Sequence, residues 1–214
     1  MADEEKTPYN SRTEGLRENG RRQQPGRGRQ PGQGLLAYVH DLIYILAAVM
    51  VVFLLFFRVV VVSGSSMYDT LVDGDYLLLV GNLFSGTLKQ GDIVVASKSS
   101  FREGEPIVKR VIATEGQTVD IDFPAGVVYV DGVALEEDYT YTPTNLSEGT
   151  AFPLTVEEGH VFLMGDNRNR SQDSRSTEIG QVDCREIMGK AIFLVFPGTN
   201  EGQDARDFHR IGGF

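Results

Sequence analysis

One long apolar stretch stands apart from the rest of the chain. Residues 42–57 are all apolar or aromatic and carry no charge, Arg58 follows, and four valines continue to Val62. A helix of about 20 residues spans the hydrocarbon core of a bilayer. Arg58, near its end, could extend its side chain to the lipid headgroups. The pattern therefore predicts a membrane-spanning helix over 41–62.

Two other interpretations of this stretch fit less well. A cleaved signal peptide has a shorter apolar segment, followed by a small-residue cleavage site. Here the stretch is long, begins after some forty residues and leads directly into a serine-rich segment that starts at Ser63. A buried core helix usually carries polar residues between its apolar ones. An uncleaved anchor is therefore the interpretation that the sequence favours.

The rest of the chain alternates short apolar runs with turn signals such as Asp73-Gly74 and Asp131-Gly132. This spacing is typical of β-strands, and no convincing amphipathic helix interrupts it. The runs are Tyr76–Val80, Ile93–Ala96, Val108–Ala113, Val127–Val130, Val161–Met164 and Ala191–Phe196. We predict a mainly β body over 63–198, a barrel or sandwich, with one N-terminal transmembrane helix.

The two ends of the chain have little apolar content. The first residues are rich in Gly, Gln, Arg and Pro, which bury too little surface to offset the entropy of ordering. We therefore expect a disordered basic tail over 1–40. The polar stretch 199–214 is expected to be a flexible C-terminal tail.

Charge is divided unevenly along the chain. Residues 1–34 contain seven basic and five acidic side chains, whereas 63–214 contain twelve basic and twenty-four acidic ones. Such an acidic body repels phosphates, so we expect no nucleic-acid partner. By the positive-inside rule, the basic end lies in the cytoplasm and the body lies outside the cell membrane, making a single-pass protein.

The sequence lacks the residues that several common classes of catalytic site require. The lone Cys184 has no obvious base nearby and is interpreted as a core residue. His160 follows a turn glycine and His209 lies in the polar tail, so neither is placed for a Ser-His-Asp triad, and no Gly-x-Ser-x-Gly motif exists. No metal-ligand spacing is present. No metal or other cofactor is expected.

A serine activated by a lysine remains possible. A lysine accepts a proton only when it is neutral, which requires apolar, water-poor surroundings. Lys109 alone among the lysines of the body lies in a strongly apolar strand pattern, Ile107–Ala113, next to Arg110. By alternation one of these two basic side chains faces inward or lies on a sheet edge. Taken alone, Lys109 fits a solvated edge lysine.

Three segments read together change that interpretation. They are Ser63–Leu71 after the predicted anchor, Lys109–Ile112, and Gly165–Arg175 with the sequence GDNRNRSQDSR. In this order they resemble the conserved boxes of type I signal peptidases, the bacterial leader peptidases with a Ser-Lys dyad. The resemblance extends from the anchor to about Pro197, and the short interval between the last two boxes resembles the compact Gram-positive form.

The resemblance implies a role for each matching residue. Ser66 matches the nucleophile and Lys109 the general base. Ser171 matches the serine that orients the lysine amine, and Asp173 with Arg175 matches a pair that braces the site. Other positions match the residues that shape the last loop (Asp166, Asn167) or receive the substrate (Gly64, Ser65, Met67, Ile107, Val108).

The function implied is a membrane-bound serine endopeptidase that removes signal peptides from secreted preproteins through an acyl-enzyme. Its expected partners are signal peptides, the lipid bilayer and the secretion translocon. One departure stands out: Asp69 occupies a position where the family usually has proline. A carboxylate three residues from Ser66 would favour the charged form of Lys109 and weaken it as a base.

Alternatives therefore stay open. A catalytically weak or inactive signal-peptide-binding homologue is consistent with Asp69, and a specialised Ser-Lys peptidase with a single substrate fits the same boxes. A repressor-type autoprotease also uses Ser and Lys, but such proteins are soluble and often carry a DNA-binding domain, which the anchor and the acidic body argue against.

Overall fold

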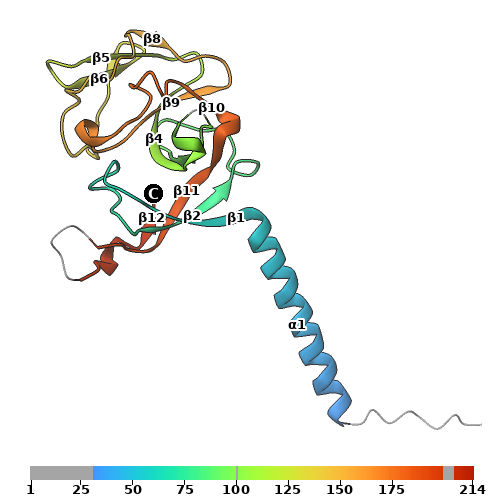
Figure 1. Ribbon diagram of the computed structural model, residues 1–214. Coiled ribbons are helices and arrows are strands. Elements are labelled where there is room, and N and C mark those ends of the chain that lie inside the picture. Colours follow the sequence, from blue (N-terminus) through green and yellow to red (C-terminus); the bar gives the residue numbers. More distant parts are fainter. Residues whose placement is uncertain (1–30, 100, 200–204) are drawn as a thin grey trace, which may run out of the picture. The chain divides into compact units, whose positions relative to one another are not determined.

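The computed structural model describes residues 31–99, 101–199 and 205–214 (Figure 1). The disorder predicted for residues 1–30 falls outside this range. The chain divides between residues 46 and 47, within the helix α1, into an N-terminal unit and a larger, β-rich unit. The prediction of a mainly β body with one N-terminal apolar helix is confirmed.

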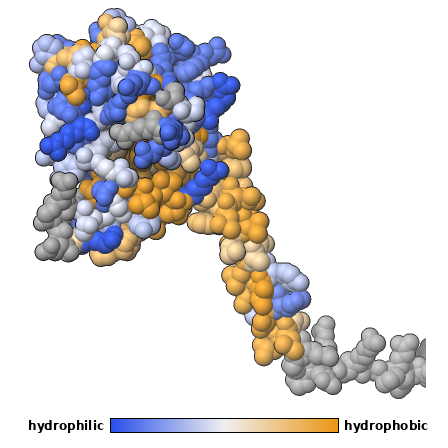
Figure 2. Space-filling view, viewed as in Figure 1, coloured by the Kyte–Doolittle hydropathy of each residue, from blue (hydrophilic) through white to orange (hydrophobic). Residues whose placement is uncertain are grey.

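Helix α1, Pro31–Phe56, contains the predicted anchor but has different ends. It begins at a proline, which the first position of a helix tolerates because no backbone donor is needed there. Its segment Gly34–Phe56 has a mean hydropathy of 2.5 and none of it is buried, and Figure 2 shows apolar side chains along most of it. The helix is therefore long and apolar enough to cross a membrane.

The helix has other bounds than the predicted span 41–62. Residues 31–40, expected to be disordered, are helical. At the other end, Phe57–Val61 form strand β1 instead of the last helical turns. Valines are β-branched and lose side-chain freedom in a helix, and here they pair with strand β2, Tyr76–Gly81. Sheet pairing thus ends the helix before the apolar stretch ends.

The larger sheet has eight strands, in the order β1-β2-β11-β3-β4-β9-β10, with β12 paired to β11 (Figure 1). All of its pairs are antiparallel. Register shifts in β11 and β4 mark bulges, which increase the local twist of a sheet. The strands beyond β1 and β2 are β3 (Ile93–Ala96), β4 (Ile107–Thr114), β9 (His160–Met164), β10 (Val182–Asp183), β11 (Ile187–Phe196) and β12 (Gly212–Gly213).

A smaller antiparallel sheet has the order β7-β6-β5-β8. Its strands are β5 (Thr118–Asp122), β6 (Val127–Val130), β7 (Val133–Ala134) and β8 (Leu154–Thr155). A hydrophobic cluster joins it to the larger sheet, with Val119 and Val128 on one side and Ile112 and Phe162 on the other. Strand β4 is therefore covered by the smaller sheet as well as by its own neighbours.

Because β4 is covered both by its neighbouring strands and by the smaller sheet, its two basic residues are buried. The strand lies between β3 and β9, and residues 108–113 are buried on both of its faces. Lys109 is 3% exposed and Arg110 is 9% exposed. The interpretation of Lys109 as a solvated edge residue is therefore wrong, because β4 is a central strand.

The described end of the chain also differs from the prediction. Residues 208–210 form a short 3₁₀ turn and β12 pairs with β11. Arg210 Nη2 contacts the fully buried Asp75 at 2.7 Å. Because this ion pair and the strand pairing hold residues 205–214 against the body, that part of the chain is not the free tail that its polar composition suggested.

Candidate active site

Ser66 lies in the turn that follows β1. Gly64, two residues earlier, has a φ of +90°, a conformation that glycine adopts without steric cost. Its N–H donates to Asp73 Oδ1 over 2.8 Å. The base of the turn is closed by backbone hydrogen bonds between Val62 and Gly74 and between Val62 and Asp75, at 2.9 and 2.8 Å. The backbone that carries Ser66 is therefore held at both of its ends.

Lys109 approaches Ser66 from the centre of the larger sheet. Its Nζ donates to Ser66 Oγ over 2.7 Å. The lysine is buried, whereas Ser66 is partly exposed. A buried amine in contact with an accessible hydroxyl is the arrangement that nucleophilic catalysis by a Ser-Lys pair requires.

Arg110, the next residue of β4, points away from this pair and binds Asp166. Its Nε and Nη2 donate to the two carboxylate oxygens over 2.8 and 2.6 Å. Thr70 Oγ1, in the turn after Ser66, donates to the same carboxylate over 2.6 Å. Asp166 therefore connects β4 to the segment that carries Ser66.

Asn167 connects the last box directly to Ser66. Its side-chain amide donates to Ser65 O and its backbone N–H donates to Ser66 O, both over 3.0 Å. Gly165 passes so close that a Cβ there would collide with Ser66 O and with Ser171 Oγ. Only glycine fits at this contact, which explains its place in the motif.

Asp173 and Arg175 form an ion pair in which both side chains are 0% exposed. Two arginine nitrogens donate to the two carboxylate oxygens, each over 2.8 Å. Asp173 Oδ2 also accepts from Gly165 N over 3.0 Å and from Ser171 Oγ over 2.8 Å. We call these four residues the brace, because together they fix the loop against Ser66. The predicted bond from Ser171 to Lys109 stays a prediction.

An open groove of about 440 Å³ gives access to Ser66 and Lys109. Four of the five residues predicted to receive substrate line it, namely Gly64, Ser65, Ile107 and Val108. The fifth, Met67, is 1% exposed and packs in the core cluster with Val62, Leu77 and Leu79. The groove is further lined by Val60–Ser63, Phe101, Glu105, Pro106, Arg170 and Gln172.

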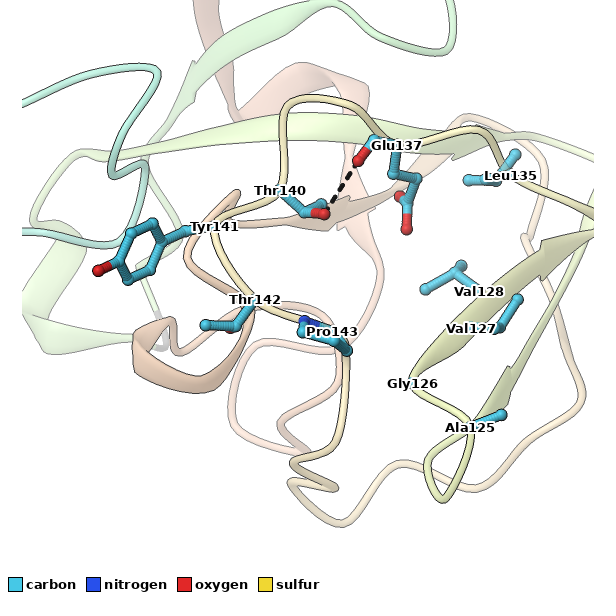
Figure 3. A pocket seen from close by; sticks show the side chains of 10 residues that line it. All are labelled: Ala125, Gly126, Val127, Val128, Leu135, Glu137, Thr140, Tyr141, Thr142 and Pro143. Atoms are coloured by element: carbon cyan, nitrogen blue, oxygen red, sulfur yellow. Dashed lines mark hydrogen bonds between the residues drawn. The ribbon is translucent and has the colours of Figure 1, made fainter.

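Figure 3 shows a second pocket, of about 350 Å³, between β6 and the segment 135–143. The Thr140 hydroxyl donates to the backbone oxygen of Glu137 over 3.0 Å. Glu137 is the one carboxylate among its lining residues, and it is bound to Arg168. The pocket thus offers no available base, so the groove at Ser66 is the candidate active site.

Several residues that support the site were not predicted. Arg168, 1% exposed, is held by the Glu137 carboxylate and by Thr144 Oγ1. The ring of Tyr139 lies under Arg110, with its centroid 3.9 Å from the guanidinium carbon. Burial and the neighbouring Glu137 raise the pKa of Tyr139. Arg168 lies within the last box, but the resemblance assigned it no role, whereas Glu137 and Tyr139 lie in a loop without a motif.

Glu148 is a further carboxylate that sequence reasoning missed. It lies beside the brace, where its Oε2 accepts from Asp173 N over 3.4 Å. Burial raises its pKa above the ordinary value, the negative charge of Asp173 raises it further, and Arg175 and Lys109 act in the opposite direction. Asp69, in contrast, is exposed, and no hydrogen bond or ion pair joins its side chain to the described residues.

Comparison with known proteins gives consistent matches. Residues 35–196 match the family described as "Signal peptidase, peptidase S26". "Probable signal peptidase I-1" of Synechocystis sp. is 36% identical over 149 residues, covering 66% of this chain and 72% of that protein. Signal peptidase I of Bacillus licheniformis is 34% identical over 149 residues, covering 66% and 77%. A crystal structure of a signal peptidase I from Enterococcus faecalis is 32% identical, covers 49% of this chain and 96% of its own, and has a TM-score of 0.39.

Proposed function

The chain belongs to the signal peptidase family of serine peptidases, peptidase S26, and we propose that Ser66 and Lys109 are its catalytic dyad. It is a hydrolase that removes N-terminal signal peptides from preproteins. The observation that supports the dyad is the 2.7 Å contact between Lys109 Nζ and Ser66 Oγ at the floor of an open groove.

The first half of the reaction forms an ester. Only an unprotonated amine accepts a proton, and burial disfavours the charged form of a lysine. Neutral Lys109 takes the proton of the Ser66 hydroxyl while Oγ attacks the carbonyl carbon of the scissile bond. The carbonyl oxygen gains the negative charge, which the Ser66 backbone N–H stabilises. The carbon–nitrogen bond then breaks, and Lys109 returns the proton to the departing amine of the mature protein.

The second half releases the signal peptide. Lys109, neutral again, takes a proton from water as the water oxygen attacks the ester carbonyl. The bond to Ser66 Oγ breaks, Oγ regains a proton from Lys109, and the signal peptide leaves with a new carboxylate. The brace and Asp166 contribute by holding Ser66 and the last box in place rather than by reacting.

The substrate is proposed to bind as an added strand in the groove, between the end of β1 and the start of β4. Val60–Ser65 and Glu105–Val108 line the groove on the approach to Ser66. Gly64 carries no side chain, so a second donor to the oxyanion comes from the backbone or from water. Small side chains at the first and third positions before the cut are the family's substrate preference and the one that we propose for this chain.

Cleavage of a preprotein that carries an Ala-x-Ala site tests the dyad. We expect Ser66→Ala and Lys109→Ala each to lower kcat/KM by about a thousandfold or more. The matched controls are Ser147→Ala and Lys89→Ala, since both residues are exposed and lie away from the groove. Cleavage at the wild-type rate by either Ser66→Ala or Lys109→Ala would refute the proposed dyad.

The apolar helix α1 fits a membrane-anchored signal peptidase. We propose further that the basic N-terminal end is cytoplasmic, that the body lies on the outer side, and that it works beside the secretion translocon where signal peptides emerge. Orientation can be measured in a Cys184→Ser background with a cysteine placed at exposed Ser147. A membrane-impermeant thiol reagent should label that cysteine in intact cells, and protection until lysis would reverse the orientation.

The alternative of an inactive signal-peptide-binding homologue is not favoured. It rested on the Asp69 carboxylate, which is exposed and joined to no described group by a hydrogen bond or ion pair. Its charge is therefore screened by water instead of acting on buried Lys109.

A further inference from the structure

The basic side chains of the acidic body are almost all engaged. Among the basic residues of 63–214 whose side chains the structure describes, a set that leaves out Arg102, all but Lys89 and Arg170 make a side-chain hydrogen bond or ion pair. The engaged residues are Lys98, Lys109, Arg110, Arg168, Arg175, Arg185, Lys190, Arg206 and Arg210. Arg170 lines the groove and Lys89 does not, so among these described side chains Arg170 is the uncommitted cation beside the reactive pair.

Arg170 does not lack an ion-pair partner because acidic side chains are scarce in this part of the chain. Carboxylates outnumber basic side chains two to one in 63–214, and exposed ion pairs of opposite charge form readily where geometry permits. Gln172, the other groove-lining residue of the same loop, is already bound, since its Nε2 donates to Glu178 Oε2 over 2.7 Å. Within this loop the exposed guanidinium of Arg170 is therefore the group that is still available to a ligand in the groove.

The backbone of Arg170 is fixed relative to Ser66 although its side chain is exposed. Its N–H donates to Asn167 O over 2.9 Å, closing the 3₁₀ turn Arg168–Arg170. Asn167 in turn donates to Ser65 O and Ser66 O. Ser171, the next residue, is buried in the brace. A guanidinium mounted on such a rigid turn loses less freedom when it binds a ligand than one on a mobile loop.

We propose that Arg170 is a specificity-determining residue that binds an acidic side chain of the preprotein close to the cut. This inference rests on the proposed function, since the ligand is the polypeptide being cleaved. A guanidinium recognises a carboxylate through two parallel hydrogen bonds, a geometry that lysine does not reproduce. The body as a whole is strongly acidic and repels acidic substrates, so the selection is local to Arg170.

Matched peptides test the contact. Each carries an Ala-x-Ala site and has either Glu or Gln at one position: the second before the cut, or the first or second after it. The measured quantity is the ratio of kcat/KM for the Glu peptide to that for the Gln peptide. For the wild type we expect a ratio of about three to ten at one of these positions. Arg170→Gln should lower that ratio to about one, and Arg170→Glu should invert it.

The controls separate local recognition from other effects. Arg185→Gln removes an equally charged residue that lies outside the groove and should keep the wild-type ratio. Arg170→Lys should keep only part of it. Because each ratio compares two peptides on one enzyme, a general loss of activity cancels.

The outcomes distinguish this inference from the function on which it rests. If the wild type cleaves the peptides with ratios near one at all three positions, or if Arg170→Gln leaves the ratio unchanged, Arg170 is not a specificity residue and the dyad stands. If the wild type cleaves none of the peptides, or if Ser66→Ala cleaves them as fast as the wild type does, the proposed function fails and this inference fails with it.

Discussion

The reactive pair and the brace are both built from polar side chains, but they are held in opposite ways. Lys109 is buried while Ser66 is half-exposed at a groove, and the two are joined at 2.7 Å. In the brace, Asp173 and Arg175 are both 0% exposed, and the Asp173 carboxylate accepts hydrogen bonds from Arg175, Gly165 and Ser171.

The difference follows from what each part has to do. A nucleophile must be reached by substrate, so its site stays open and its contacts are few. A loop that positions that nucleophile must not move, so its charged side chains are buried and form an ion pair. Substitutions in the reactive pair should therefore abolish activity without changing the free energy of unfolding. Substitutions in the brace should abolish activity and also lower the free energy of unfolding.

Breaking the ion pair of the brace should have the largest effect on stability. Asp173→Ala leaves the Arg175 guanidinium buried without its carboxylate, which costs about 3–5 kcal/mol. We expect the free energy of unfolding, measured in denaturant, to fall by that amount and cleavage to be lost. In contrast, Ser66→Ala should unfold at the wild-type midpoint.

The double variant Asp173→Leu with Arg175→Met gives the matched control. Apolar residues of similar volume often replace a buried ion pair at little cost, so the double variant should regain much of the stability but not the activity. If Asp173→Ala alone unfolds within 1 kcal/mol of the wild type, the brace does not support the fold in the way described.

Gly165→Ala tests whether the brace acts through close contact with Ser66. The added methyl group must push away Ser171 Oγ or the Ser66 carbonyl. A displacement near 1 Å at a reacting group can lower the rate by about a hundredfold, so kcat should fall far more than KM changes. Gly212→Ala, where nothing lies within 4 Å of the new methyl group, is the control. Unchanged kcat in Gly165→Ala would show that the loop tolerates movement.

Glu148 offers a change that should stabilise the protein modestly. Its pKa is raised above the ordinary value of 4.5, chiefly by burial, so folding disfavours its ionised form. That cost is absent well below pH 4.5 and is fully present above the raised pKa. Glu148→Gln should therefore raise the Tm at pH 7 to 8 and leave it unchanged near pH 3. A Tm of Glu148→Gln below that of the wild type at pH 7 to 8 would contradict the expected stabilisation.

Asp69→Asn should have the smallest effect. The carboxylate is exposed and joined to no described group by a hydrogen bond or ion pair, so removing its charge should change kcat/KM by less than about twofold. The measurement is cleavage of the same preprotein at low and moderate salt. A large gain of activity in Asp69→Asn, greatest at low salt, would mean that the carboxylate does weaken Lys109.

Much of the larger sheet could be predicted because its longer strands are rich in apolar residues. All six predicted runs are strands, five of them in the larger sheet and one, Val127–Val130, as β6 of the smaller sheet. Strand β1 was missed because its valines continue the apolar stretch of α1, and a short apolar run has no period that separates helix from strand. Strand β5, Thr118–Asp122, was missed because strands were predicted from apolar runs, whereas β5 alternates polar and apolar residues, which is the pattern of a strand with one buried face. Strand β12 consists of two glycines, which carry no pattern.

The residues of the site could be predicted only where they belong to a sequence motif. Ser66, Lys109 and the box Gly165–Arg175 were found together, by resemblance, and the structure brings them within contact. The surroundings of Lys109 were misjudged because the burial of β4 depends on a second sheet far away in sequence. Glu137 and Glu148 were missed for a similar reason, since an isolated loop carboxylate looks the same whether it is solvated or paired.

The most direct measurement is covalent labelling of the nucleophile. An acylating inhibitor of serine peptidases, followed by peptide mapping with mass spectrometry, reports which oxygen attacks a carbonyl and does not depend on the substrate chosen. We predict modification at Ser66 in the wild type, a large loss of labelling in Lys109→Ala although Ser66 is still present, and labelling at the wild-type rate in Lys89→Ala. Modification at a residue other than Ser66, or equal labelling of Ser66 in Lys109→Ala, would contradict the assignment of this pair as nucleophile and base.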